Sequence, residues 1–255
     1  MDPFVEYEER VEKTFFEKME KKEQISDPKQ VPILGRKLLE KTILMNFFAE
    51  WWGGINYFRC LHLAPNTAEM QYMEVIAREE MGHAQILTKG SLALFGIDPH
   101  ALLAKTAKEQ KNLLQVFKHP ETLTRSWGDV LMFNRLQDAS ADMQLDEFAD
   151  GMFEPYANDI RQIEAEEAGH VEHANRSMRE YVQTIPHKYE LQRALSFWLP
   201  LVLDVFGNQN GKSQQLYLTY RLKSRTNEES RKLFISQITP FFHEMGLYHP
   251  LLTVQ

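Results

Sequence analysis

Two nearly identical pentapeptides, placed far apart in the chain, constrain the fold more than any other feature of the sequence. They are Glu79-Glu80-Met81-Gly82-His83 and Glu166-Glu167-Ala168-Gly169-His170. On a helix, residues three positions apart share a face, so each copy can direct one carboxylate and one imidazole at the same point. A single Glu-x-x-His helix is usually a solvated face. Two matched copies instead predict helices that meet around a site for two metal ions.

The remaining sequence has the pattern of helices. Apolar residues recur at intervals of three and four, strand-like alternation is rare, and proline and glycine separate the periodic segments. The expected helices span residues 4–24, 32–62, 66–95, about 100–117, 127–150, 155–182, 186–206 and 226–246, with a kink at Pro200. We therefore expect an all-α fold in a single domain over residues 1–255. Its core is a four-helix bundle at about 32–183, with additional peripheral helices at 1–25 and 186–246.

Pairing these helices as antiparallel hairpins identifies two more candidate ligands. A ligand on the first arm must lie as far before the turn as the Glu-x-x-His pair lies after it. Glu50 precedes the first pair by 30 residues, and the midpoint is the Pro65-Asn66 turn. Asp138 precedes the second pair by 29 residues, and the midpoint lies near Gly151. Fifteen helical residues rise about 22 Å, so the site should lie well inside the bundle.

The predicted site is thus made of four carboxylates and two imidazoles. Its members are Glu50, Glu80, His83, Asp138, Glu167 and His170. Carboxylates can bridge two divalent cations and neutralise them, whereas imidazole suits iron better than magnesium. Without cations, four acids in an apolar bundle would repel one another and lose hydration, so some would be protonated. The set matches the inward-facing ligands of ferritin-like di-iron and di-manganese proteins. We expect two iron ions, with manganese in one position as an alternative.

Several neighbouring residues have competing interpretations. Asp142 lies one turn after Asp138 and can present a carboxylate to the same face. Glu79 and Glu166 are about 100° around the helix from the predicted ligands, so we expect them to face elsewhere. His173 is expected on an ordinary polar face, with a role beside the metal ligands as the alternative.

Other distinctive residues are interpreted as packing. Glycine in a helix interior is unfavourable by about 1 kcal/mol, so Gly82 and Gly169 indicate close packing or space at the site. The aromatic residues of the 32–62 segment and the Trp198-Leu199-Pro200 segment are expected in the core.

Charge and hydropathy exclude several classes of function. The net charge is −7 and lysine and arginine are scattered among acids, so nucleic-acid binding is not expected. Cys60 is the only cysteine, which excludes an internal disulfide and fits a reducing compartment. The richest apolar run, 197–206, is shorter than the ~20 residues of a membrane span and contains Asp204. The acidic start of the chain is unlike a signal peptide. We expect a cytoplasmic protein without membrane contact.

The chain resembles the phenylacetic acid catabolic protein family of ferritin-like proteins. The resemblance extends from about residue 40 to 246 and rests on several motifs. Besides the two Glu-x-Gly-His segments, these are Ser126-Trp127-Gly128-Asp129, Phe197-Trp198-Leu199-Pro200, Phe206-Gly207 and Leu222-Lys223-Ser224-Arg225-Thr226-Asn227-Glu228-Glu229. The catalytic subunits of that family bind a di-iron centre, and the resemblance maps its ligands onto the six residues above, favouring Asp138 over Asp142. Their structural sister subunits lack these ligands, so the chain resembles the catalytic type.

The resemblance implies a di-iron monooxygenase component. Such a component takes electrons from a separate reductase, activates O2 and epoxidises or hydroxylates an aromatic or acyl substrate, with a CoA thioester as one candidate. The acids Glu50, Glu80, Asp138 and Glu167 would carry the chemistry together with the metals. The resemblance also implies a homo- or hetero-oligomer with a structural subunit, for which the charged helix 4–24 offers a contact surface or is merely solvated. Alternative functions are a ferritin-like iron-oxidising or metal-handling protein and a non-catalytic scaffold subunit.

Two departures from the resembled enzymes bear on the substrate. Ile76 lies one turn before Glu80, where those enzymes have a lysine near the metal site, which predicts a changed pocket. The chain also stops soon after Gly246, which predicts fewer contacts with the CoA portion of a thioester.

Overall fold

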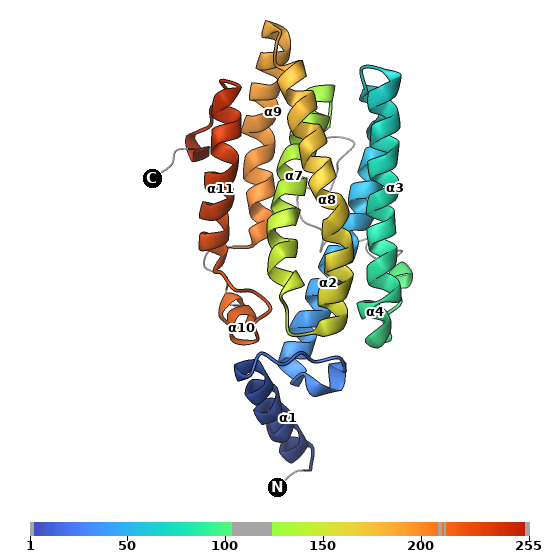
Figure 1. Cartoon of the computed structure of the whole chain (residues 1–255), viewed down its shortest axis with the longest axis vertical. Helices are drawn as coiled ribbons and strands as arrows, with labels where there is room; N and C mark the ends of the chain where they lie inside the picture. Colours follow the sequence, from blue (N-terminus) through green and yellow to red (C-terminus); the bar gives the residue numbers. More distant parts are fainter. Residues whose placement is uncertain (1–2, 104–123, 209–210, 212, 253–255) are drawn as a thin grey trace.

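Four long helices run along the long axis of the molecule (Figure 1). They are α2 (Ile33–Cys60), α3 (Thr67–Lys89), α7 (Trp127–Ala149) and α8 (Glu154–Tyr181). The computed structural model describes residues 3–103, 124–208, 211 and 213–252. Helix α2 packs along α3, and α7 packs along α8, as the two predicted hairpins require. The prediction of an all-α, ferritin-like bundle is confirmed; the described segments contain one isolated bridge, Ile25 with Phe153, and no strand.

Side-chain caps set where these helices begin. The Asn66 side chain accepts a hydrogen bond from the backbone N–H of Glu69 at 3.0 Å, which starts α3. Ser126 caps α7 in the same way. Each cap satisfies an N–H group that has no partner inside its own helix. Short polar residues before each apolar run therefore fix the register of the arms that carry the predicted ligands.

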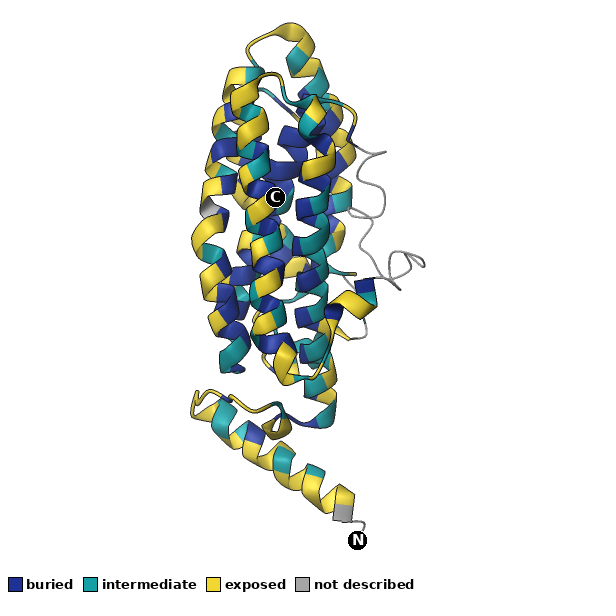
Figure 2. Ribbon diagram, turned by 90° about the vertical axis from the view of Figure 1, so that its right-hand side faces the viewer, coloured by how far each residue is buried: buried dark blue, intermediate teal, exposed yellow. Residues whose placement is uncertain are grey.

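The helices outside the four-helix core lie on two sides of it. Helix α9 (Ile185–Leu203) packs along α7, and α11 (Asn227–Glu244) begins at a capping box formed by Thr226 and Glu229. Helix α9 continues through Pro200 and ends three residues later. Helix α1 (Pro3–Glu20) lies beyond one end of the bundle and is mostly exposed, as expected for a charged surface helix (Figure 2). None of the helices in the described part of the chain is long and apolar enough to cross a membrane.

Two elements differ from the sequence-based expectation. The segment expected as one helix over 66–95 breaks at Gly90, after which α4 (Ser91–Leu94) begins. The break has a cause in α8, because the Asp159 carboxylate lies against Gly90 and accepts a hydrogen bond from the Ser91 N–H at 2.7 Å. Helix α10 (Gln214–Thr219) was not anticipated. The helix expected over 100–117 is helical at 99–103, and its remainder lies outside the described residues.

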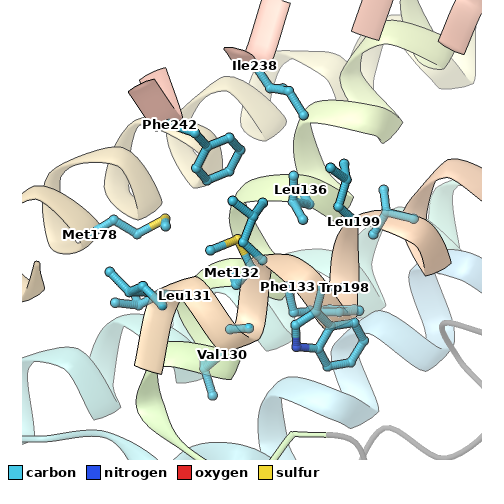
Figure 3. Packing of buried hydrophobic residues seen from close by; sticks show 14 of the residues in the cluster. Val130, Leu131, Met132, Phe133, Leu136, Met178, Trp198, Leu199, Ile238 and Phe242 are labelled. Atoms are coloured by element: carbon cyan, nitrogen blue, oxygen red, sulfur yellow. The ribbon is translucent and has the colours of Figure 1, made fainter. Parts of the chain in front are cut away.

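Two apolar cores lie one after the other along the bundle. One contains the end of α2, the start of α3 and the first half of α7, together with α9 and α11. Phe133 and Trp198 lie side by side in this core, with ring centroids 5.1 Å apart (Figure 3). The other core contains the start of α2, the end of α3, the end of α7 and the start of α8. Each long helix therefore passes from one core to the other, and the predicted metal ligands occupy the layer between them.

Candidate metal centre

The six predicted ligand residues come together in this middle layer. Helix α2 contributes one of them, α7 another, and α3 and α8 contribute a pair each. All are buried, with exposed fractions between 1% and 7%: Glu50, Glu80, His83, Asp138, Glu167 and His170. Burial of four acids and two histidines at one level of an apolar bundle is unfavourable unless they neutralise one another or bind cations.

Three residues converge at each of two points. His83 Nδ1 lies 3.1 Å from Glu50 Oε2 and 3.2 Å from Glu167 Oε1. His170 Nδ1 lies 3.5 Å from Glu167 Oε2 and 3.6 Å from Glu80 Oε1. Ligand atoms of each group lie within 4.8 Å of one another, a spacing that could hold one metal ion. Glu167 directs one oxygen at each group, so it is placed to bridge two ions.

Asp138 lies at the edge of the second group. Its Oδ2 is 3.9 Å from His170 Nδ1, and the residue is 3% exposed. Asp142, the alternative considered from the sequence, is exposed to solvent. The structure therefore brings Asp138 to the cluster and leaves Asp142 outside it.

Glu79 and Glu166 contact the histidines, so the expectation that they face elsewhere was wrong. Glu166 Oε2 lies 3.1 Å from His83 Nε2, and Glu79 Oε2 lies 2.8 Å from His170 Nε2. Each glutamate contacts the histidine of the opposite helix: Glu79 of α3 contacts α8, and Glu166 of α8 contacts α3. In the neutral form that binds a metal ion, an Nε2–H that donates to a carboxylate would leave the Nδ1 lone pair directed at the centre of the cluster.

The acids of the cluster have strongly perturbed pKa values. Burial raises the pKa of Glu50, and it raises the pKa of Glu80 and of Asp138 well above the ordinary values, with added repulsion from Glu167. Glu167 behaves differently: burial opposes its ionisation, but its interactions with His170 and His83 lower its pKa to about 2. Glu167 is therefore the ionised member of the metal-free cluster, while its neighbours favour protonation.

Both histidines are cationic at neutral pH in the metal-free protein. Burial lowers the pKa of His83, but hydrogen bonds to Glu167 and Glu50 raise it to about 11. Burial likewise lowers the pKa of His170, but Glu167 and Asp138 raise it to about 9. Two imidazolium groups thus supply the positive charge that this layer needs.

The donor set fits a pair of divalent transition-metal ions. Within the described residues, the buried Nδ1 of His170 makes no hydrogen bond, although three carboxylates lie 3.5 to 3.9 Å away. A metal ion would satisfy this nitrogen and replace the two imidazolium protons. Mixed imidazole and carboxylate ligands favour iron or manganese over magnesium or calcium.

Two adjacent glycines of α2 that sequence reasoning overlooked make room for a side chain of the cluster and for the backbone of α3. A Cβ atom at Gly53 would lie 2.6 Å from Glu80 Oε2, and one at Gly54 would lie 2.8 Å from the Ala77 carbonyl oxygen. Their occurrence as a pair in mid-helix was the available signal. In contrast, Gly82 and Gly169 are exposed, and an added Cβ would meet no described atom within 4 Å, so close packing does not explain them.

His173 is buried, which differs from the polar face expected for it. It stacks on Tyr72 with ring centroids 3.5 Å apart, and its Nε2 lies 3.0 Å from Glu69 Oε2. These contacts join α8 to α3 one turn beyond the cluster. Burial lowers the pKa of His173. Trp198 and Leu199 are fully buried, which confirms the packing interpretation for these two residues, whereas Pro200 is exposed.

Two cavities lead toward the cluster between α2 and α7. The inner one has a volume of about 30 Å³ and is lined by four of the acids together with Tyr57 and Phe133. The outer one has a volume of about 310 Å³ and extends to α10 and the start of α11. Both are lined by Ala49, Glu50, Gln137 and Ala141. Ile76, for which the sequence predicted a changed pocket, is buried in an apolar core and lines neither cavity.

Comparison with known proteins agrees with the resemblance inferred from the motifs. Residues 19–254 match the family model of the phenylacetic acid catabolic proteins. The chain is also 24% identical over 243 residues to one of the subunits of 1,2-phenylacetyl-CoA epoxidase from Escherichia coli (strain K12), covering 94% of this chain and 77% of that relative. The family match spans most of the sequence, including both arms of each hairpin. The chain therefore belongs to the phenylacetic acid catabolic protein family.

Proposed function

We propose that this chain is the oxygen-activating component of a di-iron monooxygenase that epoxidises or hydroxylates an aromatic or acyl substrate. The single observation that carries the proposal is the convergence of two carboxylate and histidine groups that share Glu167. The bound iron pair would supply the redox chemistry that reduces O2, with electrons from a separate reductase. Family membership and the similarity to an epoxidase component support the same reaction class.

In this scheme the protein residues hold the metal ions, exclude water and release protons when the ions bind. Glu50 and His83 would hold one ion, Glu80 and His170 the other, and Glu167 would bridge them. The apolar cores on both sides exclude bulk water from the layer, which favours productive oxygen chemistry over side reactions. Because both histidines are protonated before metal binding, loading the centre releases their protons.

The sizes of the two cavities favour an elongated substrate whose small reactive end enters the inner cavity. The inner cavity of about 30 Å³ has room for one small molecule beside the acids. The outer cavity of about 310 Å³ has apolar walls that include Met45, Leu145 and Phe148, which suit an aromatic ring or an acyl chain. A substrate that enters through the outer cavity therefore presents its end to the metal ligands.

Two lysines of the outer cavity, Lys41 and Lys223, support an anionic carrier group. Lys223 also lines an open groove of about 660 Å³, where Arg221 and Arg225 lie beside the acids Asp146, Glu147 and Asp150. Burial lowers the pKa of Lys223, and its Nζ donates a hydrogen bond to the Asn227 side chain at 3.2 Å. Phosphate groups of a CoA thioester would be compatible with these two lysines.

The experiment is a single-turnover reaction of the iron-loaded protein. Protein reduced in the absence of air is mixed with phenylacetyl-CoA and ¹⁸O2, and the products are analysed by mass spectrometry. We expect one ¹⁸O atom in the organic product. Free phenylacetate serves as the comparison, because it has the same ring without the CoA group. A variant with Glu80→Ala and His83→Ala is expected to give no oxygenated product.

The alternative functions give different outcomes in the same experiment. Saturable oxidation of Fe(II) without an organic product, across aryl and acyl thioesters, would indicate a metal-handling protein. Failure to bind iron would indicate a scaffold component. Either result would contradict the proposed monooxygenase.

A further inference from the structure

Asp138 differs from the other acids of the centre in how it is held. It is the only aspartate among four acids, and it belongs to neither of the two close groups. Its carboxylate instead receives hydrogen bonds from two neutral donors. The Tyr57 hydroxyl of α2 lies 3.4 Å from both carboxylate oxygens. The side-chain amide of Asn134, one turn earlier on α7, donates to Asp138 Oδ2.

Tyr57, Asn134 and Asp138 form a closed, buried triangle. The Asn134 amide also donates to the Tyr57 hydroxyl oxygen at 2.8 Å. The three residues are 2%, 3% and 3% exposed, respectively. Burial raises the pKa of Tyr57 well above its ordinary value, so the phenol keeps its proton and remains a donor. The carboxylate is therefore fixed in direction by two groups that carry no charge.

The short side chain of Asp138 fits this arrangement. An aspartate has one methylene fewer than a glutamate, so its carboxylate stays close to the α7 backbone, one turn from Asn134. The Tyr57 hydroxyl reaches this carboxylate from the α2 side, at 3.4 Å from both of its oxygens. The triangle thus gives a physical reason why α7 supplies an aspartate to the cluster, whereas the other three helices supply glutamates.

A similar asparagine–tyrosine pair joins α2 to α8 and makes no hydrogen bond to a predicted ligand, so it is a natural control. Asn46 lies four residues before Glu50, just as Asn134 lies four residues before Asp138. Its amide donates to the hydroxyl of Tyr156, a buried residue of α8. Among the described residues, neither Asn46 nor Tyr156 makes a hydrogen bond to Glu50.

We propose that Tyr57 and Asn134 are positioning residues that hold Asp138 beside His170 and thereby complete the second metal position. This inference rests on the two-metal centre of the proposed function. The first position, around Glu50 and His83, does not depend on the triangle. Tyr57 and Asp138 also line the inner cavity, so the two donors hold the Asp138 carboxylate at the wall of that cavity.

The test is metal binding by the full chain, independent of catalysis. Metal-free wild type, Tyr57→Phe, Asn134→Ala and the control Tyr156→Phe are titrated with Co(II), which is stable to air on this timescale and has a visible spectrum. We expect wild type to bind two ions. Tyr57→Phe and Asn134→Ala should weaken the affinity for the second Co(II) ion by about 10- to 100-fold and leave the affinity for the first ion unchanged. The double variant should lose little more than either single variant, because the two residues share one network.

Tyr156→Phe separates positioning from folding. It removes a buried tyrosine–asparagine hydrogen bond of the same kind, so its thermal midpoint should fall about as much as that of Tyr57→Phe, while both ions bind as in wild type. If Tyr57→Phe weakened the binding of both ions equally, or bound both ions as well as Tyr156→Phe does, the inference would be overturned and the proposed function would stand. A wild type that binds fewer than two ions would overturn both.

Discussion

At the scale of single residues, the histidines of the centre are oriented by acids on both sides of the ring. The Nδ1 atom of His170 faces the cluster, and its Nε2 atom contacts Glu79. The ring of His83 is arranged in the same way, with Glu166 at its Nε2 atom. The two outer glutamates are partly exposed, with side-chain exposures of 36% and 52%. They therefore act on the buried centre from its solvent side, through the imidazole rings.

Replacing Glu79 by glutamine should lower the pKa of His170. The Glu79 carboxylate contributes to the elevation of that pKa to about 9, and an amide keeps a hydrogen-bond acceptor but removes the charge. We expect a fall of roughly one pKa unit, typical for the loss of one charged hydrogen bond. Imidazole NMR of the metal-free protein measures it. Glu180→Gln, at an exposed position of α8, is the control, and an equal shift in both variants would contradict the prediction.

Replacing Glu80 by glutamine should stabilise the metal-free protein while impairing metal binding. Burial and the neighbouring acids raise the pKa of Glu80, so the folded state holds a proton that the unfolded state releases above pH 4.5. Stability of the wild type is therefore lost as pH rises from that value, and glutamine avoids the loss. We expect a gain of about 1–3 kcal/mol at pH 7 that disappears near pH 4.5. Denaturant unfolding at the two pH values tests this, and a gain that persists at pH 4.5 would argue against it.

At the scale of helices, the approach of α2 to α3 depends on adjacent glycines with different neighbours. A methyl group at Gly53 would meet the end of the flexible Glu80 side chain, whereas one at Gly54 would meet the Ala77 carbonyl oxygen of α3. A side chain can turn away, but a helix backbone cannot do so without moving the whole element. Gly53 therefore leaves space for a side chain of the site, and Gly54 allows the backbones of α2 and α3 to pack closely.

The variants Gly53→Ala and Gly54→Ala should separate these roles. Alanine favours a helix by about 1 kcal/mol over glycine, so Gly53→Ala should be neutral or slightly stabilising. The same variant should weaken metal binding, because the new methyl group displaces the Glu80 carboxylate. Gly54→Ala should lower the free energy of unfolding by about 1–3 kcal/mol through overpacking. Thermal unfolding and Co(II) titration of both proteins provide the measurement; identical behaviour of the pair would refute the distinction.

Features that repeat within one helix could be predicted from the sequence, whereas those created by a neighbouring helix could not. Caps such as Asn66 and the three-residue spacing of Glu80 and His83 are local, and they predicted the hairpins and the residues that converge. The contact of Glu79 with His170 joins α3 to α8, so the angle around one helix was misleading. The break at Gly90 has the same origin, because the carboxylate that caps α4 comes from Asp159.

At the scale of the whole molecule, the polar layer couples folding to protons and metal. Two apolar cores hold the ends of the bundle together, and the layer between them concentrates acids and imidazolium groups. The cores favour folding at every pH, but the layer favours it only while its protons, or metal ions in their place, balance the carboxylates. Loss of protons from this layer should therefore lower the free energy of unfolding of the whole metal-free protein.

We accordingly predict that the stabilisation given by metal grows with pH. The raised pKa values of His83, to about 11, and His170, to about 9, contribute stability that is complete below pH 6.5 and is lost as pH rises through those values. The raised pKa values of Glu50, Glu80 and Asp138 act in the same direction from about pH 4.5 upward. Metal ions replace these protons, so loaded protein should lack the decline. Thermal midpoints with and without Mn(II) from pH 5.5 to 9 should diverge steadily, and parallel curves would show that the histidines are neutral before metal binds.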